Sequence, residues 1–300
     1  MDFKYLTYNN IDKAKYDKCI SASKNHLVYA ESWYLDIVCN KNWSALVLND
    51  YEAVMPLALK SKMGLTYVQQ PFWTQQLGVF SKEVITPELV DSFLQNAPKK
   101  LAMVSINLNE TNFTEAAKLD AKTNLIVDLN TSFEVLKTTF SSNTKRNCNK
   151  ANKEDLTINF ESKNVTEYIN FFKVHIKNPV SEFQYNSLEQ IITESLKQGK
   201  GFIALVKSEN EIVAASFILK SNNRLIYRTG TSNQKGKDTK AMFFLVQSIL
   251  KQYQNKNYIL DFEGSELEGV ARFYKGFGGV NVPYYYYKKI NNKLLKVLGK

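Results

Sequence analysis

The alternation of apolar and polar residues is clearest in the second half of the chain. Three apolar runs, 202–207, 211–220 and 224–229, are separated only by the short polar turns 208–210 and 221–223. Short apolar runs joined by tight polar turns are typical of antiparallel strands that follow one another in a sheet. We therefore predict a three-stranded antiparallel meander in this region.

Helical spacing follows the meander. Residues 238–254 carry apolar side chains three and four positions apart, as on one helix face: Met242, Leu245, Val246, Ile249 and Leu250. This pattern predicts a long helix. A strand at 258–262, a short helix at 268–277 and a last strand at 282–290 complete the order β-β-β-α-β-α-β.

The rest of the chain also mixes helices and strands. Between the halves we predict a basic, mostly helical segment, then a strand and two helices: 132–151, 156–161, 165–176 and 187–198. In the first half we predict three helices at 13–23, 32–39 and 87–97. The strands predicted there are 43–49, 51–60, 64–70, 75–81, 101–108 and 123–129. The first half thus resembles the second, with a weaker pattern.

Composition places the chain among globular proteins. It has 300 residues, 44% of them hydrophobic and 23% charged, which suffices for two ordinary domains. The longest apolar stretch is 212–219, far short of the ~20 residues that span a bilayer, and the first residues do not resemble a signal peptide. Three widely spaced cysteines, Cys19, Cys39 and Cys148, predict neither a disulfide framework nor a zinc site. We expect a soluble, cytoplasmic protein with no transmembrane segment and no metal site.

The positive charge is concentrated in the second half. Residues 1–128 carry 13 basic and 14 acidic residues, whereas residues 129–300 carry 26 and 15. Such an imbalance indicates an anionic partner for the second half: a nucleotide cofactor, a tRNA, a phosphorylated substrate or a membrane surface. A lysine-rich solvated surface is the alternative interpretation.

Residues 258–278, which read YILDFEGSELEGVARFYKGFG, resemble the C-terminal signature of FemAB-related proteins. Residues 142–146, which read SNTKR, resemble the opening of that family's second domain. Known members transfer amino acids from aminoacyl-tRNA to peptidoglycan precursors. The resemblance implies a mixed α/β (α+β) chain of two tandem GNAT-like domains, the first degenerate. We place acceptor binding in residues 1–130, and donor binding and chemistry in residues 131–300.

Two departures from the family pattern bear on the donor. No heptad repeat marks the long helical arm of some members. The acyl-CoA phosphate loop of GNAT enzymes, Q/R-x-x-G-x-G/A, is replaced by residues 233–240, with Gly236 as their single glycine. No cofactor is certain, and acyl-CoA and aminoacyl-tRNA both remain candidate donors.

The fold also implies where a donor would bind. A strand splayed from its neighbour would offer backbone N–H groups to an oxyanion near Arg228, Thr229 and Gly230, although an ordinary strand end is the alternative. Residues ahead of the long helix would hold a pyrophosphate or tRNA phosphate: Lys235, Gly236, Lys237 and Thr239. The alternative for them is a polar loop with Asp238 as helix N-cap.

Three residues near the signature could support acyl transfer. The resemblance places Tyr274 where a leaving group is protonated and Lys275 near the acyl carbonyl. Glu263 is a candidate base, while Asp261 is expected to be a buried partner of Arg272. A core aromatic, a solvated lysine and a turn residue are the respective alternatives.

Substrate contacts are predicted in both halves. Arg146 could clamp an anionic group through bidentate hydrogen bonds. In the first half, Trp73, Gln75 and Gln76 could line an acceptor pocket, or could form a turn packed around its own aromatic ring. The two histidines, His26 and His175, lie far from any metal-ligand pattern.

Three functions agree with this sequence. The first is a FemAB-like acyl or aminoacyl transferase acting on an amine, with a cell-wall precursor as candidate acceptor. The second is a non-catalytic GNAT-like protein that binds an anionic ligand. The third is an acetyl-CoA-dependent N-acetyltransferase. The pattern predicts no oligomeric state.

Overall fold

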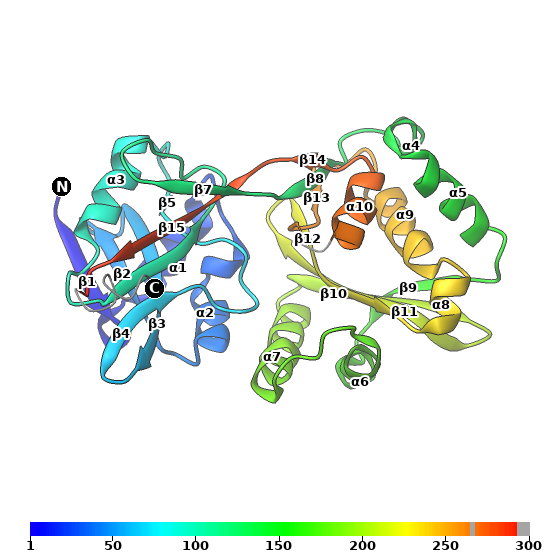
Figure 1. Cartoon of the computed structure of the whole chain (residues 1–300), viewed down its shortest axis with the longest axis horizontal. Helices are drawn as coiled ribbons and strands as arrows, with labels where there is room; N and C mark the ends of the chain where they lie inside the picture. The colour runs from blue at the N-terminus through cyan, green and yellow to red at the C-terminus, as the bar shows by residue number, and fades with distance from the viewer. Residues whose placement is uncertain (265–267, 293–300) are drawn as a thin grey trace. The chain divides into compact units, whose positions relative to one another are not determined.

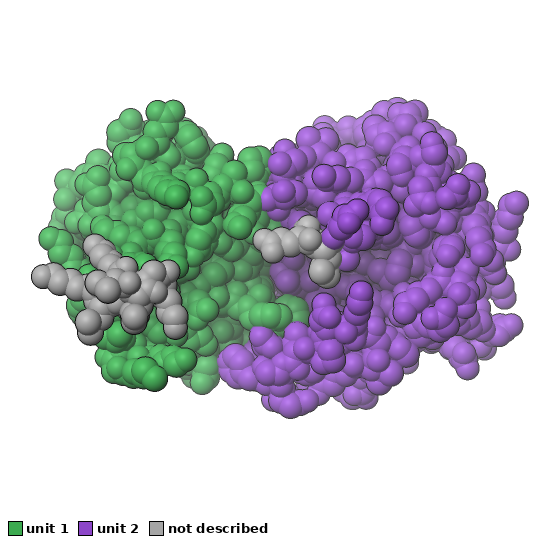
Figure 2. Space-filling model, viewed as in Figure 1, with its two compact units in different colours: residues 1–122, 283–300 green, residues 123–282 purple. Residues whose placement is uncertain are grey.

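The structure, a computed structural model, describes residues 1–264 and 268–292. The chain divides into two compact units. Unit 1 comprises Met1–Lys122 and the chain from Pro283 onward, and unit 2 comprises Thr123–Val282 (Figure 2). Each unit is built around its own mixed sheet.

The sheet of unit 2 contains the predicted meander, which is confirmed. Strands β10 (Gly201–Ser208), β11 (Glu211–Ser221) and β12 (Arg224–Ser232) pair antiparallel in sequence order. Strand β13 (Ile259–Asp261) then runs parallel to β12. The remaining strands are β8 (Leu125–Asp128), β9 (Thr157–Ser162) and β14 (Val280–Asn281), and the sheet order is β14-β8-β13-β12-β11-β10-β9.

Helices cover both faces of this sheet (Figure 1). Helices α6 (Val165–His175) and α7 (Glu182–Lys197) pack on one face. The other face carries α4 (Phe133–Thr139), α5 (Ser142–Ala151), α8 (Gln234–Asp238), α9 (Ala241–Tyr253) and α10 (Glu268–Gly276). Between sheet and helices lies a core that includes Ile218, Leu245, Ile249 and Phe277.

Two predicted helices have different bounds. Helix α7 begins five residues before the prediction, because the Ser181 and Gln184 side chains form a capping box there. The helix predicted at 238–254 begins only at Ala241 as α9, after Lys240 in the left-handed conformation with φ 60°, and the separate short helix α8 precedes it. The cap of α8 is Asn233, so the prediction of Asp238 as an N-cap is wrong.

Unit 1 repeats the plan of unit 2. Its main strands are β1 (Phe3–Thr7), β2 (Trp43–Leu48), β3 (Ala53–Lys62), β4 (Leu65–Gln69), β6 (Met103–Leu108), β7 (Leu119–Lys122) and β15 (Tyr284–Ile290). Their order is β1-β2-β3-β4-β6-β15-β7, with β6 parallel to β4 as β13 is to β12. The helices are α1 (Lys13–Ala22), α2 (Ser32–Val38) and α3 (Pro87–Asn96), with short 3-10 turns at Tyr8–Asn10 and Val28–Ala30. Of the strand predicted at 75–81, only β5 (Phe80–Ser81) forms, against β3.

The two sheets share one strand order, as the predicted tandem GNAT-like fold requires. In each sheet, a strand distant in sequence lies between two strands that follow one another along the chain. Strand β8 lies between β13 and β14, and β15 lies between β6 and β7. The compact units therefore differ in extent from the predicted domains 1–130 and 131–300.

Unit 1 is the reduced copy. Residues 109–118 form no helix, although the equivalent connection in unit 2 contains α10. The first copy also has no helix in the position of α8 among the described residues 70–86. The structure agrees with the expectation that the first GNAT-like domain is degenerate.

Candidate active site

Strands β12 and β13 diverge after a very short pairing. Only Arg224, Leu225 and Ile226 pair with β13, opposite Ile259, Leu260 and Asp261. The register of β12 against β11 shifts between the pairs formed by Tyr227 and Thr229, which marks a β-bulge at Arg228. Bulges bend a strand and are frequent beside active sites. Beyond the bulge, the residues of β12 do not pair with β13.

A buried ion pair stands at this divergence. The Arg228 guanidinium donates a hydrogen bond to the Glu263 carboxylate, and the two side chains are only 13% and 10% exposed. Glu263 has a φ of 61°, which costs a non-glycine residue roughly 1–3 kcal/mol. Its N–H group donates to Asp261 Oδ1 at 2.7 Å, which supports this conformation.

The role predicted for Asp261 is half right. Its carboxylate is buried, but its partner is Arg224 at 2.5 Å rather than Arg272, which lies exposed on α10. The parallel register explains this pairing. Ile226 lies opposite Asp261, and Arg224 lies two residues before Ile226 on the same strand. The strand ends at Asp261, so Glu263 lies in the following turn and does not alternate with it along the sheet.

Tyr274 lies in an aromatic stack beside this ion pair. Its ring stacks on Phe262 at 4.6 Å between centroids and meets the edge of Tyr227 at 6.0 Å. Burial raises the pKa of Tyr274, the Glu263 charge raises this pKa further, and the Arg228 charge opposes them. The phenol is therefore neutral near pH 7 and can donate a proton. The structure brings the predicted residues Tyr274 and Glu263 together.

The residues predicted to face an oxyanion on β12 have defined surroundings. The Thr229 side chain lies 2.5 Å from the Tyr168 hydroxyl of α6, and the Thr229 carbonyl accepts a hydrogen bond from Ser216 at 2.7 Å. A Cβ atom on Gly230 would lie 2.1 Å from the Tyr227 hydroxyl. The backbone at Gly230 must therefore stay free of a side chain for the Tyr227 ring to lie across it.

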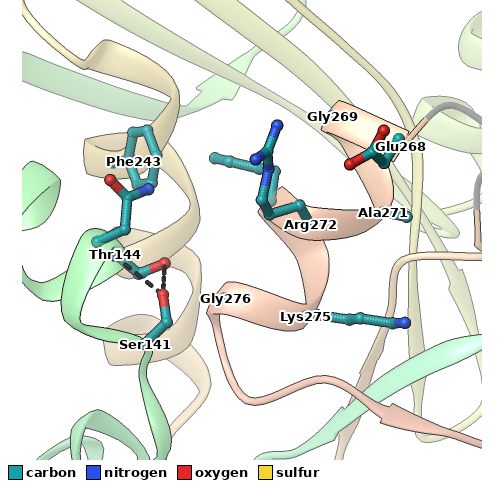
Figure 3. A pocket seen from close by; sticks show the side chains of 11 residues that line it. Ser141, Thr144, Phe243, Glu268, Gly269, Ala271, Arg272, Lys275 and Gly276 are labelled. Atoms are coloured by element: carbon teal, nitrogen blue, oxygen red, sulfur yellow. Dashed lines mark hydrogen bonds between the residues drawn. The ribbon is translucent and has the colours of Figure 1, made fainter.

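A pocket of about 800 Å³ adjoins the other side of α10 (Figure 3). It lies against the start of α5, the first turn of α9 and α10, and its lining includes Asn143, Thr144, Phe243, Glu268, Arg272 and Lys275. Figure 3 shows Lys275 extending away from Ser141 and Thr144. Lys275 is exposed, and within the described residues its side chain forms no hydrogen bond or ion pair. Its predicted contact with an acyl carbonyl stays a prediction.

The predicted phosphate loop is occupied by its own hydrogen bonds. The N–H group of Gly236 donates to the Asn233 side chain at 2.8 Å, and that of Thr239 donates to the Lys235 carbonyl at 2.9 Å. Lys235 pairs with Glu209 at 2.6 Å, while Lys237 is exposed. A Cβ atom on Gly236 would lie 2.1 Å from a backbone carbonyl of β11. These contacts account for the glycine by packing, and phosphate binding by this loop stays a prediction.

The predicted acceptor residues of unit 1 lie in a loop that fills the equivalent divergence there. Strands β4 and β6 pair over only two residues, after which Leu77 bonds to Asn107 at 2.7 Å. Trp73 and Gln76 are buried, and Gln76 bonds to Gln75 at 2.7 Å and to the Glu110 N–H group at 3.2 Å. The chain itself thus lies between the diverging strands β4 and β6 of unit 1.

Arg146, the predicted anion clamp, is exposed on α5 and donates to Asn143 at 2.9 Å. Sequence reasoning missed Tyr168, Tyr227 and Phe262, because buried aromatic residues are indistinguishable from ordinary core in a pattern. It named Arg228 only for its backbone.

The described residues contain no cluster of three or more His, Cys, Asp or Glu side chains suited to a metal ion. Among the helices that the structure describes, none combines the length and the apolar character needed to cross a bilayer.

Comparisons with solved structures define the class of fold. A crystal structure of FemX matches with a TM-score of 0.70 and 12% identity over 100% of both chains. L-PGS from Bacillus licheniformis matches with a TM-score of 0.54 and 18% identity, over 88% of this chain and 89% of that one. A tandem GNAT protein from the clavulanic acid biosynthesis pathway matches with a TM-score of 0.54 and 8% identity, over 97% and 99%. No family model and no curated protein matches the sequence.

The fold is therefore a tandem GNAT-like fold. In its particular form it is FemX-like over the whole chain.

Proposed function

We propose that unit 2 is an acyl or aminoacyl transferase that acts on an amine, and that its donor is an aminoacyl ester carried by tRNA. The observation that carries the proposal is the neutral, half-buried Tyr274 beside the Arg228–Glu263 pair, where β12 and β13 diverge. An acyl group held along the β12 edge would have a proton donor and a cation at hand. Unit 1 is the proposed acceptor domain, with a cell-wall precursor as the acceptor class and the cytoplasm as the compartment.

The proposed reaction is an addition followed by an elimination. The amine nitrogen forms a bond to the acyl carbon, and the carbonyl oxygen becomes an oxyanion beside the β12 backbone near Gly230 and the Arg228 cation. The bond from the acyl carbon to the ribose oxygen then breaks. Tyr274 gives its proton to that oxygen and recovers the proton that the amine nitrogen loses, so the step is balanced.

The raised pKa of Tyr274 favours an ester over a thioester donor. A thiol has a pKa of about 8.5, so a departing thiolate is a weaker base than the Tyr274 phenolate and would not draw its proton. A departing ribose alkoxide is a far stronger base and would draw it readily. The internal hydrogen bonds of residues 233–240 add to this, because those N–H groups do not face a CoA pyrophosphate.

Glu263 and Lys275 take different parts in the proposal. Glu263 already neutralises Arg228, and an ion-paired carboxylate is a weak base, so we assign it the positioning of the Arg228 guanidinium. Lys275 is exposed on α10 one residue from Tyr274, and we propose that its ammonium group approaches the acyl carbonyl when the donor is bound.

A non-catalytic protein that binds an anionic ligand is the second candidate. The occupied phosphate loop favours it, because a donor site with one element lost can survive as a binding site. The two candidates differ in whether an amide product forms.

The first experiment measures the melting temperature of the purified protein with acetyl-CoA, aminoacyl-tRNA and a nucleotide-activated peptidoglycan precursor, each alone. A ligand of the native state at 100 times its Kd adds about 2.7 kcal/mol to the free energy of unfolding. The proposal expects a rise with aminoacyl-tRNA, and amide product when tRNA and precursor are combined. A rise with acetyl-CoA alone, or binding of tRNA without any product, would contradict it.

A further inference from the structure

Helix α5 has an unusually one-sided composition. Its ten residues, Ser142–Ala151, include three cations and no acidic residue: Lys145, Arg146 and Lys150. The only apolar residues, Cys148 and Ala151, are buried. The exposed surface of α5 therefore consists of cations with hydroxyl and amide groups between them.

A second cationic group lies where α5 packs on α4 and α9. A small pocket of about 80 Å³ there is lined by Lys137, Lys145 and Lys251, together with Asn149 and Asn152. Lys137 and Lys251 both line this pocket, and the charges of both oppose the rise that burial causes in the pKa of Cys148. Of the described lining residues, Glu134 alone is acidic; its side chain is 80% exposed and lies 3.8 Å from Lys137.

The size of this pocket limits its ligand. Pockets for whole small molecules measure about 300–1,000 Å³, so this one is suited to a single anionic group of a larger ligand. Lys145 donates to the Thr138 carbonyl at 3.0 Å, and Lys251 lies over the Phe133 ring at 5.0 Å. Both ammonium groups are held in place, and each still has N–H groups that can donate hydrogen bonds to an anion.

Helix α5 connects this small pocket with the large pocket beside α10. Its first residues, Asn143 and Thr144, line the large pocket, and Lys145 and Asn149 line the small one. A helix of this length extends roughly 15 Å. A ligand that follows the cations of α5 from one pocket to the other carries several negative charges, as a chain of phosphates does.

An anionic membrane fits this surface less well. Helices that lie on membranes present apolar side chains beside their cations, and α5 exposes none. Amide and hydroxyl groups between cations are instead the side chains that contact phosphate and sugar in nucleic-acid complexes.

We propose that α5, with Lys137 of α4 and Lys251 of α9, is the docking surface for the phosphodiester backbone of the RNA that carries the donor. This cationic face rests on the proposed function for the identity of the RNA. It places the acyl group beside Tyr274, the adjoining end of the RNA across α10 at the large pocket, and the following phosphates along α5.

The test measures fluorescence anisotropy of a labelled RNA hairpin with a single-stranded 3′ end and no acyl group, from about 50 to 200 mM salt. Each phosphate contact contributes about −0.7 to −0.9 to the slope of log affinity against log salt. The variant Lys145→Gln/Lys150→Gln/Lys251→Gln should lower the magnitude of this slope by about 2. It should also weaken RNA binding at least about tenfold. The matched control Lys173→Gln/Lys177→Gln/Lys197→Gln changes the same charge around α6 and α7 and should keep the wild-type slope.

Three results would overturn the proposal: no RNA binding by the wild type, equal binding by wild type and the α5 variant, or an equal loss in the control. Two further arms address other anions. Displacement of the RNA by ~1 mM inorganic phosphate would mean a single-anion site, because a multi-contact backbone is not displaced by one phosphate. If the α5 variant lost binding to phosphatidylglycerol vesicles while its RNA binding stayed unchanged, the cationic face would be assigned to a membrane.

The proposed function can fail separately from this surface. RNA without an acyl group tests docking alone, so RNA binding by a protein that forms no amide would contradict only the transferase. Amide formation from a donor without RNA, by a protein that does not bind RNA, would contradict only the docking surface.

Discussion

The guanidinium of Arg228 and the carboxylate of Glu263 form a buried ion pair across 35 residues of sequence, at the point where β12 and β13 diverge. The pair connects the bulged strand to the turn after β13, whose φ of 61° at Glu263 is unfavourable for a side chain. It therefore fixes the two strand ends beside which the proposed chemistry takes place.

Removal of one partner of this pair should lower the free energy of unfolding more than removal of both. Glu263→Gln leaves a buried guanidinium without its counter-charge, which typically destabilises a protein by about 3–5 kcal/mol. The double variant Arg228→Met/Glu263→Met should lose less, because no buried charge remains. Urea denaturation measures both. The exposed pair Lys235–Glu209 is the control, and Lys235→Gln should leave the urea midpoint unchanged.

Two glycines in helices of unit 2 should respond oppositely to alanine. A Cβ atom on Gly236 would lie 2.1 Å from the Val213 carbonyl, so Gly236→Ala must displace backbone and should destabilise by about 2 kcal/mol or more. A Cβ atom on Gly269 would meet nothing within 4 Å, and Gly269→Ala should stabilise by about 0.5–1 kcal/mol. Thermal melts without ligand compare them. Equal melting temperatures would mean that packing does not explain Gly236, and would return it to the phosphate-binding interpretation.

The three cysteines should make stability fall at alkaline pH. Burial raises the pKa of Cys19 and Cys148 to about 11 and that of Cys39 to about 12. The unfolded thiols ionise near pH 8.5, so this contribution to stability is complete below about pH 8.5 and is lost as pH rises through 11 to 12. Urea midpoints from pH 7 to 11 measure the loss. A variant with alanine at all three positions should lose less over the same range, and identical pH profiles would contradict the assignment.

Lys275→Ala should lower the rate of transfer without altering the fold. The side chain is exposed on α10, so its removal should leave the melting temperature within about 2 °C of the wild type. If its ammonium group stabilises the acyl oxyanion, kcat should fall about 10²-fold or more. Lys289→Ala on β15 of unit 1 is an exposed control. Unchanged kcat would remove Lys275 from the mechanism.

The meander, the helices around it and the order of these elements along the chain followed from local pattern. The β10–β11 turn was evident from the short polar segment 208–210, and in the structure Glu209 and Asn210 have the positive φ values of 51° and 69° that a tight hairpin needs. The start of α7 was missed because its capping box lies outside the apolar periodicity. The break at Lys240 was missed because the helical spacing of residues 242–250 is unaffected by it.

Features that depend on distant pairing could not be predicted from sequence. Strand β8 pairs with β13, and β15 pairs with β6, so the unit boundaries depend on contacts more than 100 residues apart. The same holds for the site. Glu263 and Tyr274 were predicted from the signature, but the partner of Glu263 is fixed by the bulge in β12, which no local pattern marks.

The most direct test of the central claim is the rate of amide formation by wild type and Tyr274→Phe from an aminoacyl-tRNA ester and from the matching aminoacyl-CoA thioester. Phenylalanine keeps the stack on Phe262 and removes only the hydroxyl, so the fold should be unchanged. The account predicts that wild type uses the ester, and that the variant loses about 10²-fold or more of that rate, because general acid catalysis contributes this much. A wild type that prefers the thioester, or a variant that is equally active with the ester, would contradict it.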